Sequence, residues 1–476
     1  MHHKKGGLLQ LEKTIQATNL WESFTENARA FSDLTEQFVH DGINPGGYYK
    51  AVWCRDAAYI LKDWFLSGRF EDVMREMLFI WSHQISADGE RIIYGRGSPE
   101  MQYTSQVASP EVQKKFEGAL PSTIFYGFSE VYGRNPDIDS TALMISTTSW
   151  ILDTYLKSGM MMPSSAQQVP GAAELKMSSV AAAPSTMIDF VVPRMLRAAG
   201  YLASRDIDGD GLLEQGHNED WMDTVLRAGK IVYSQACWIL ALGNLSSLLT
   251  ELGRTEEASK VMSRAYRAIR AVERTLWSEK EGTYIDIQEA HHVGGPYKTL
   301  TQDVALYLVA ITENTARDIV SSHLKGESTQ DEKILPEFSD RGARTLDAMK
   351  SRIWKDKWPL VTEAELERTG PWVLHPNQYH NHTLWPWTTG IEMLARSRFG
   401  QVQECYALLS MLTSKDSQSA VRAYHEWVNP VTDVGSGAYP FRTGISAIRI
   451  AIADILGQIS NGGSSSTSSN NSNNTF

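Results

Sequence analysis

One segment, residues 206–223, concentrates side chains that could carry out acid–base chemistry. It reads D-I-D-G-D-G-L-L-E-Q-G-H-N-E-D-W-M-D and places seven carboxylates and three glycines between two apolar stretches with helical spacing. A run this polar cannot form core, and its glycines indicate a shaped loop. Trp221 and Met222 point the end of the loop toward an apolar environment. A carboxylate beside an aromatic ring at such a loop-to-helix junction suits proton transfer to a sugar.

A second carboxylate in a similar setting is Glu426, which stands between His425 and Trp427 just before a Pro/Gly-rich loop. Taken singly, each carboxylate is better explained as an ion-pair or capping residue. Two carboxylates in aromatic loops, far apart in sequence, fit an acid and a base on opposite faces of a sugar ring. The pair therefore favours hydrolysis of a glycosidic bond over a purely structural role.

Metal chemistry has weaker support in the sequence. Asp206-x-Asp208-x-Asp210-Gly211 matches the opening of a calcium loop, but the twelfth position, where a bidentate Glu is required, is His217. Glu214 leaves calcium open, although a hydrogen-bonded turn explains the segment better. The histidine pairs at 291–292 and at 380 and 382 lack zinc-ligand spacing, and no G-x-S-x-G nucleophile motif supports a Ser-His-Asp triad. We predict no metal and no cofactor.

Composition limits the classes of partner. The chain has 476 residues, a net charge of −11 and a pI near 5.6, with no basic stripe, which excludes nucleic acid and favours a neutral ligand. The 14 tryptophans suit stacking on sugar rings, although core packing accounts for some of them. The three cysteines are far apart and are expected to be buried reduced thiols. With no apolar run of membrane-spanning length and no leader, we expect no membrane association and a cytoplasmic protein.

Helices must position the polar loops, because apolar residues with helical spacing dominate the chain between them. Units of helix, loop and helix, with polar loops at alternate connections, predict an all-α fold in which paired helices form a barrel. We expect one domain over residues 1–460, a low-complexity excursion near 162–184 and a disordered Ser/Asn-rich tail over 461–476. Helices are predicted over residues 27–39, 56–65, 70–84, 137–156, 186–202, 232–252, 256–277, 300–312, 341–354, a segment ending at 396, 402–412 and 441–456.

Several motifs that follow one another along the chain resemble those of the six-hairpin (α/α)6-barrel glycosidases, a group that includes glycogen-debranching α-1,6-glucosidases, glucoamylases and family 63 glycoside hydrolases. The resemblance covers most of the chain, from about residue 48 to 450. It departs from the glucoamylases, which carry W-E-E where this chain has W-M-D. The motifs are Trp53-Cys54-Arg55-Asp56, Asp208-Gly209-Asp210-Gly211-Leu212, Trp221-Met222-Asp223, Tyr379-His380-Asn381 with Trp385-Pro386-Trp387, and Glu426 with Asn429-Pro430 and Gly435-Ser436-Gly437.

The resemblance implies an inverting, exo-acting α-glycosidase with Asp223 as general acid and Glu426 as general base, an α-glucosidase in the first instance. Asp220 is the rival acid. Open alternatives are a hydrolase of an α-mannoside, glucosylglycerate or trehalose-type substrate, a phosphorylase, and a non-catalytic sugar-binding module on the same barrel. The partner in each case is a carbohydrate. The residues that the resemblance assigns to substrate binding are Tyr48, Trp53, Arg55, Asp56, Trp221, His380, Trp385 and Trp427.

Overall fold

The computed structural model describes residues 2–102, 104–158, 184–286, 300–313, 316, 318–320, 334–356, 358–363, 365 and 375–465. The predicted excursion near 162–184 lies outside these residues except for Pro184. The histidine pair at 291–292 lies outside them as well. So does the predicted disordered tail beyond residue 465, whereas residues 461–465 end the last helix.

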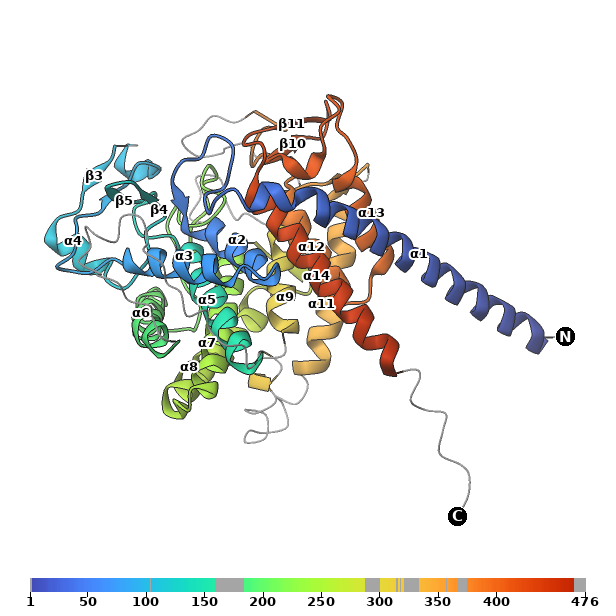
Figure 1. The fold of residues 1–476 in the computed structure, drawn as a ribbon, viewed down its shortest axis with the longest axis horizontal. Coiled ribbons are helices and arrows are strands. Elements are labelled where there is room, and N and C mark those ends of the chain that lie inside the picture. Colours follow the sequence, from blue (N-terminus) through green and yellow to red (C-terminus); the bar gives the residue numbers. More distant parts are fainter. Residues whose placement is uncertain are drawn as a thin grey trace, which may run out of the picture.

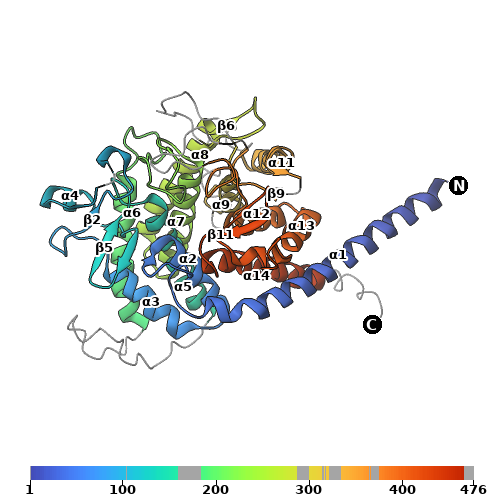
Figure 2. The ribbon, with the colours of Figure 1, turned by 90° about the horizontal axis from the view of Figure 1, so that it is seen from above.

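Helices alternate between an inner and an outer ring as the chain proceeds (Figures 1 and 2). Successive inner helices pack against each other, and the last packs against the first, so the ring closes. This arrangement confirms the predicted all-α (α/α)6 barrel. The inner ring consists of α2 (Cys54–Leu66), α5 (Ile138–Ser158), α7 (Val232–Glu251), α9 (Ala305–Thr312), α12 (Pro386–Arg398) and α14 (Arg442–Ser465). The outer ring consists of α1 (His2–Val39), α3 (Phe70–Ser82), α6 (Pro184–Ala203), α8 (Thr255–Thr275), α11 (Ile334–Arg352) and α13 (Val402–Thr413).

The composition of the helices matches their place in the rings. Every side chain of the inner helix α9, which reads A-L-Y-L-V-A-I-T, is buried. The inner helix α7 is long and apolar enough to cross a membrane, but 89% of that apolar window is buried inside the structure, as in the core helix of a barrel. The outer helix α8 buries one stripe that includes Val261, Ala265, Ile269 and Val272, at helical spacing. An inner helix thus packs on all sides, and an outer helix packs on one.

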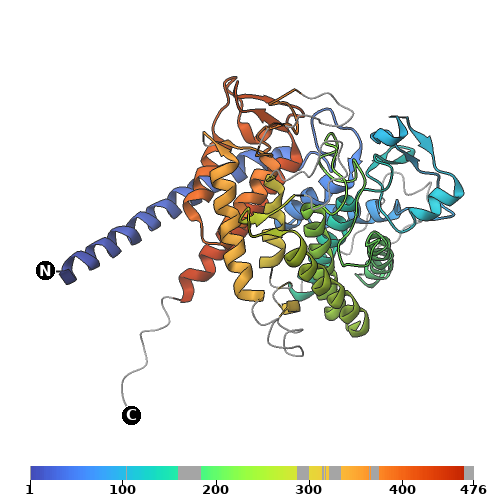
Figure 3. The same ribbon diagram turned by 180° about the vertical axis from the view of Figure 1, so that it is seen from behind.

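The main difference from the predicted helices is α1, which begins at His2 rather than at residue 27. Its C-terminal half packs through Phe24 and Phe31 into a second apolar cluster with α13 and α14. Its N-terminal end extends beyond the body of the barrel (Figure 3). The predicted helix over 300–312 is also divided, because a 3-10 turn, η2 (Gln302–Val304), precedes α9.

A small sheet beside the barrel was not predicted. Its strand order is β1-β4-β5-β2-β3, antiparallel except for the parallel pair β2 and β5. The strands have two to four residues each, too short for period-two alternation to be recognised in the sequence. Pairing of Trp53 with Thr123 joins the sheet to the start of α2. The strands are β1 (Val52–Trp53), β2 (Ile93–Tyr94), β3 (Gln106–Val107), β4 (Thr123–Phe125) and β5 (Phe128–Val131), with η1 (Pro99–Met101) and α4 (Pro110–Lys115) between β2 and β4.

Among the residues that the structure describes, three short antiparallel hairpins lie in the remaining connections. The last of them follows Glu426 directly and is tied to the barrel through the bridge between Leu384 and Val428. The hairpins are β6 (Trp277–Ser278) with β7 (Thr283–Tyr284), β8 (Trp354–Lys355) with β9 (Trp358–Pro359), and β10 (Trp427–Asn429) with β11 (Val434–Ser436), which η4 (Arg422–Tyr424) precedes.

Candidate active site

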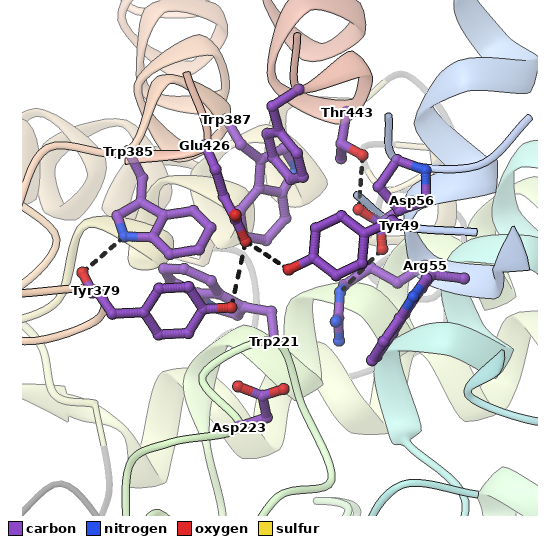
Figure 4. Close-up of a pocket in the computed structure, with 13 residues that line it drawn as sticks. Tyr49, Arg55, Asp56, Trp221, Asp223, Tyr379, Trp385, Trp387, Glu426 and Thr443 are labelled. Atoms are coloured by element: carbon purple, nitrogen blue, oxygen red, sulfur yellow. Dashed lines mark hydrogen bonds and ion pairs between the residues drawn. The ribbon is translucent and has the colours of Figure 1, made fainter. Parts of the chain in front are cut away.

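A pocket lies at the end of the barrel where the inner helices begin (Figure 4). Arg55 and Asp56 stand in the first turn of α2, Trp387 in that of α12 and Thr443 in that of α14. Helix N-termini carry partial positive charge, which favours carboxylates at this end. The pocket encloses about 430 Å³, including space open to solvent at its mouth. Its lining residues are Pro45, Tyr49, Trp53, Arg55, Asp56, Trp221, Asp223, Tyr379, Trp385, Trp387, Glu426, Phe441 and Thr443.

Asp223 lies on one side of this pocket, at the end of the acidic loop (Figure 4). Its side chain is 15% exposed, and among the described residues its Oδ1 atom has no hydrogen-bond partner. Burial raises the pKa of this carboxyl to about 7, because the charged form is poorly solvated there. The positive charge of Arg55 lowers this pKa, and the negative charges of Glu426 and Asp220 raise it. The site therefore favours a carboxyl that keeps its proton near neutral pH.

Glu426 lies on the opposite side of the pocket from Asp223 (Figure 4). It is only 1% exposed, and both of its carboxylate oxygens accept hydrogen bonds. The donors are Tyr49 Oη at 2.7 Å and Tyr379 Oη at 3.3 Å to Oε1, and Tyr48 Oη at 3.0 Å and the Ala438 N–H at 2.8 Å to Oε2. An ionised carboxylate is purely an acceptor, so it satisfies all four donors at once and is held in one orientation.

Two glycines close to Glu426 could not be replaced by a residue with a Cβ atom without a steric clash. Gly437 has φ +78°, and a Cβ atom there would lie 2.6 Å from the Cβ of Glu426 and would collide with its carboxylate. A Cβ atom at Gly435 would collide with the ring of His425. The Gly-Ser-Gly segment quoted from the sequence thus lets β11 pass directly over the candidate base.

Arg55 and Asp56 are held by separate partners deep in the pocket. Arg55 Nη1 donates to Asp139 Oδ2 at 3.1 Å, whereas its contact with Asp56 is longer, Nε to Oδ2 at 3.9 Å. Asp56 accepts instead from Thr443 Oγ1 at 2.6 Å. Burial raises the pKa of Asp56, and Arg55 opposes that shift. Asp139, which also accepts from the Tyr233 hydroxyl at 3.1 Å, is a site residue that the sequence analysis missed.

Aromatic rings line the part of the pocket that lies between the two candidate catalytic carboxylates. The ring centroid of Trp221 lies 4.7 Å from that of Trp387 and 5.4 Å from that of Trp385, both in edge-to-face geometry. The Trp385 indole N–H donates to the Tyr379 carbonyl at 2.9 Å. Rings fixed in this way offer apolar faces of the kind that can stack on a sugar ring.

Three residues predicted to bind substrate do not line the pocket. His380 is buried behind it, stacked on Trp385 at 4.8 Å with its Nδ1 atom 2.8 Å from Thr224 Oγ1. Burial lowers the pKa of His380 well below its usual range. Trp427 is half-buried beside Glu426, and Tyr48 is 60% exposed above it. Of the predicted residues, the pocket brings together Trp53, Arg55, Asp56, Trp221, Asp223, Trp385 and Glu426.

Asp220, the rival acid, does not line the pocket. It is 2% exposed, its Oδ1 atom accepts from the Met222 N–H at 3.0 Å, and its Oδ2 atom accepts from Gln215 Nε2 at 2.8 Å. Arg227 lies 3.5 Å from Oδ2. These partners occupy both oxygens of the carboxylate, so the geometry favours Asp223 as the group that faces a substrate.

The acidic turn that resembles a calcium loop is held by cationic side chains. Carboxylate oxygens of Asp206, Asp208 and Asp210 lie within 4.8 Å of one another. Lys230 Nζ lies between the last two, 2.6 Å from Asp208 Oδ2 and 2.8 Å from Asp210 Oδ2, and Arg267 pairs with Asp206. Backbone N–H groups of the turn donate to all three carboxylates. The geometry is that of the hydrogen-bonded turn preferred from the sequence.

Solved structures with the same architecture support the family resemblance at the level of the fold. A GH63 mannosylglycerate hydrolase from Thermus thermophilus in complex with Tris matches with a TM-score of 0.55 and 14% identity, over 90% of this chain and 99% of that one. A glycosidase in complex with glucose matches with a TM-score of 0.53 and 13% identity, over 92% and 98% of the two chains. A rhamnosidase from Klebsiella oxytoca with rhamnose bound matches with a TM-score of 0.51 and 12% identity, over 91% and 64%.

Sequence comparison adds nothing to these matches. No family model and no curated protein matches the chain. With identities of 12–14%, the solved structures establish the fold that the motifs predicted, and the chemistry has to be argued from the pocket.

Proposed function

We propose that this protein is an inverting, exo-acting glycoside hydrolase that removes one sugar from the non-reducing end of an α-glycoside. Its main support is that Asp223 and Glu426 face each other across an aromatic-walled pocket in two different electrostatic environments (Figure 4). Two carboxyl groups whose surroundings differ in this way can act as acid and base at the same pH. Asp223 is desolvated, and Glu426 is surrounded by donors.

In the proposed reaction, Asp223 donates its proton to the glycosidic oxygen as the bond from that oxygen to C1 breaks. Glu426 removes a proton from a water molecule that attacks C1 from the opposite face, and the anomeric configuration inverts. An inverting enzyme requires ~6.5–9.5 Å between the two carboxyl groups to leave room for this water. The position of the two residues on opposite sides of the pocket supports a pair of carboxyl groups that flank the glycosidic bond, and the resemblance to inverting glycosidases is the reason for proposing inversion over a double displacement.

The inner end of the pocket supports exo action. Arg55 and Asp56, both in the first turn of α2, close it and offer a donor and an acceptor to hydroxyl groups of a terminal sugar. Thr443 and Asp139 hold this pair in place from α14 and α5. A pocket closed at one end takes the end of a glycan rather than its middle.

The substrate we propose first is an α-glucoside, as the motifs imply. Hydrolysis of an α-mannoside, glucosylglycerate or a trehalose-type substrate is the alternative, and the match to a mannosylglycerate hydrolase keeps it in consideration. A non-catalytic sugar-binding module is a second alternative. The desolvated carboxyl of Asp223 counts against it, because its Oδ1 atom has no hydrogen-bond partner among the described residues and a site that only binds gains nothing from that.

The experiment that tests this proposal is proton NMR of the sugar first released from maltose, isomaltose, panose, trehalose, glucosylglycerate and mannosylglycerate. We expect β-glucose to appear first from one α-glucoside. First appearance of α-glucose would refute inversion and require new roles for both carboxylates. Lack of turnover across the panel, combined with sugar binding, would support the module instead.

Two variants assign the roles. Asp223→Asn and Glu426→Gln should each reduce kcat by about 10³-fold or more, since each removes one proton-transfer step. Asp220→Asn tests the rival acid and should lose less activity than Asp223→Asn, because its amide oxygen can still accept from the Met222 N–H although its pairing with Arg227 is weakened. Near-wild-type turnover in Asp223→Asn together with loss of turnover in Asp220→Asn would reassign the acid.

A further inference from the structure

A cluster of buried charges lies behind the acid-bearing loop, outside the pocket. Arg227, which is 1% exposed, stands among the carboxylates of Asp220, Asp286 and Asp303, each no more than 2% exposed. Its Nη2 atom donates to Asp286 Oδ1 at 2.7 Å and to Asp303 Oδ2 at 2.9 Å, and its Nε atom lies 3.5 Å from Asp220 Oδ2. We call these four residues the Arg227 cluster.

The cluster joins three segments that are separate in sequence. Arg227 and Asp220 belong to the loop that connects α6 and α7, Asp286 follows β7, and Asp303 lies in η2 just before α9. A charged group this well buried reduces the stability of the fold unless an opposite charge pairs with it. Removal of one partner therefore leaves an uncompensated charge, and the remaining groups must move or change protonation. Burial raises the pKa of Asp220 and raises that of Asp286 to about 7; the charge of Arg227 opposes both shifts, and the charge of Asp303 adds to them.

Two direct bonds connect the cluster to the segment that carries Asp223. The Trp221 indole N–H donates to Asp303 Oδ2 at 2.7 Å, so the carboxylate that pairs with Arg227 also fixes a wall of the pocket. Asp220 Oδ1 accepts from the backbone N–H of Met222, the residue before Asp223. The side chain of Trp221 and the backbone of Met222, on the N-terminal side of Asp223, are thus both held from behind.

We propose that Arg227 and Asp303 are positioning residues for the acid: their buried ion pair holds Trp221 and the turn at Asp220, and through them it sets where the Asp223 carboxyl lies in the pocket. The inference rests on the proposed function, because it takes Asp223 as the proton donor. Neither residue lines the pocket, so any effect on turnover passes through Trp221 and the backbone of the loop.

Kinetics of Asp303 variants test the proposal on the substrate that the NMR panel identifies. Asp303→Leu removes both the acceptor for Trp221 and the partner of Arg227. A shift of the acid by about 1 Å can cost roughly 100-fold, so we expect kcat to fall about 10- to 100-fold with KM changed much less. Asp303→Asn keeps an oxygen that can accept from Trp221 and should recover part of the loss. Arg227→Lys keeps the positive charge but lacks the guanidinium group that contacts several carboxylates at once, so its kcat should lie between those of wild type and Asp303→Leu.

Lys230→Met is the matched control. It removes another buried cation from the same loop, but one that pairs with Asp208 and Asp210 rather than with the cluster. We expect kcat within about threefold of wild type for this variant. Equal losses in Lys230→Met and Asp303→Asn would mean that the loop responds to any lost ion pair, and the proposed role for Arg227 and Asp303 would be wrong.

A spectroscopic readout separates this inference from the proposed function. Protein labelled with ¹⁵N-tryptophan gives indole N–H resonances for its 14 tryptophans, and the one missing in Trp221→Phe is that of Trp221. We expect this resonance to move upfield in Asp303→Asn, the variant least prone to misfold, and to stay in place in Lys230→Met. If no panel substrate is turned over, the function fails while this shift still tests the contact. An unmoved resonance, or an Asp303→Asn variant with wild-type kcat, would overturn the inference.

Discussion

The buried carboxyl of Asp223 should make the native protein less stable as the pH rises, and Asp223→Asn should remove that cost. Burial raises its pKa from the ordinary 3.8 to about 7. Since one pKa unit corresponds to about 1.4 kcal/mol, the cost of ionising Asp223 in the folded protein is at most about 4 kcal/mol. The folded state binds the proton more tightly than the unfolded state, so the free energy of unfolding falls between about pH 4 and pH 7 and levels off above.

Below the unfolded pKa the wild-type carboxyl is protonated in both states and resembles an amide. Asp223→Asn should therefore match wild type near pH 4 and exceed it by up to about 4 kcal/mol near pH 8, while its turnover is lost. The assay is urea unfolding of both proteins at several pH values, with Asp206→Asn as a control at a carboxylate outside the pocket. A stability difference that does not change with pH would refute the desolvation of Asp223.

Further predictions concern the base, the sugar clamp and the pH profile. Gly437→Ala should reduce kcat more than 10-fold, because the added Cβ atom would collide with Glu426. Steady-state kinetics test this, and the control is Gly457→Ala, whose Cβ atom would meet nothing within 4 Å. Thr443→Val removes the 2.6 Å bond to Asp56 and should raise KM about 5- to 10-fold; an unchanged KM would refute a role for Asp56 in binding. In a pH–rate profile, kcat/KM should fall about tenfold per pH unit above about pH 7 as Asp223 loses its proton; a flat alkaline side would contradict its role as acid.

The barrel could be predicted because both of its signals are local. Apolar residues recur at helical spacing along the chain, and the polar loops between the helices can be recognised without knowing which helices meet. The two candidate carboxylates could be singled out for a similar reason, since each stands within two residues of a tryptophan in a short motif. Local patterns of this kind can be recognised without any knowledge of tertiary contacts.

Asp139 could not be predicted, because it stands in the first turn of α5, where an Asp is ordinary, and its role depends on the packing of α2 against α5, which places it 3.1 Å from Arg55. Tyr49 was passed over for its neighbour Tyr48, and only the fold shows that both hydroxyls reach Glu426. The small sheet was not predicted, because its strands are too short to show an alternation of apolar and polar residues and form only through pairing with one another. The sequence left Asp220 and Asp223 as rivals, and burial of both oxygens of Asp220 by other residues is a purely tertiary property.

Closure of the inner ring by α2 and α14 brings residues 41–56 and 426–443 together at the pocket. Arg442 binds Asp41, Thr443 binds Asp56, and Glu426 receives Tyr48 and Tyr49 from more than 370 residues earlier. During synthesis the pocket therefore cannot be completed by residues 41–56 until α14 has also left the ribosome. Loss of α14 should abolish the proposed sugar binding rather than weaken it.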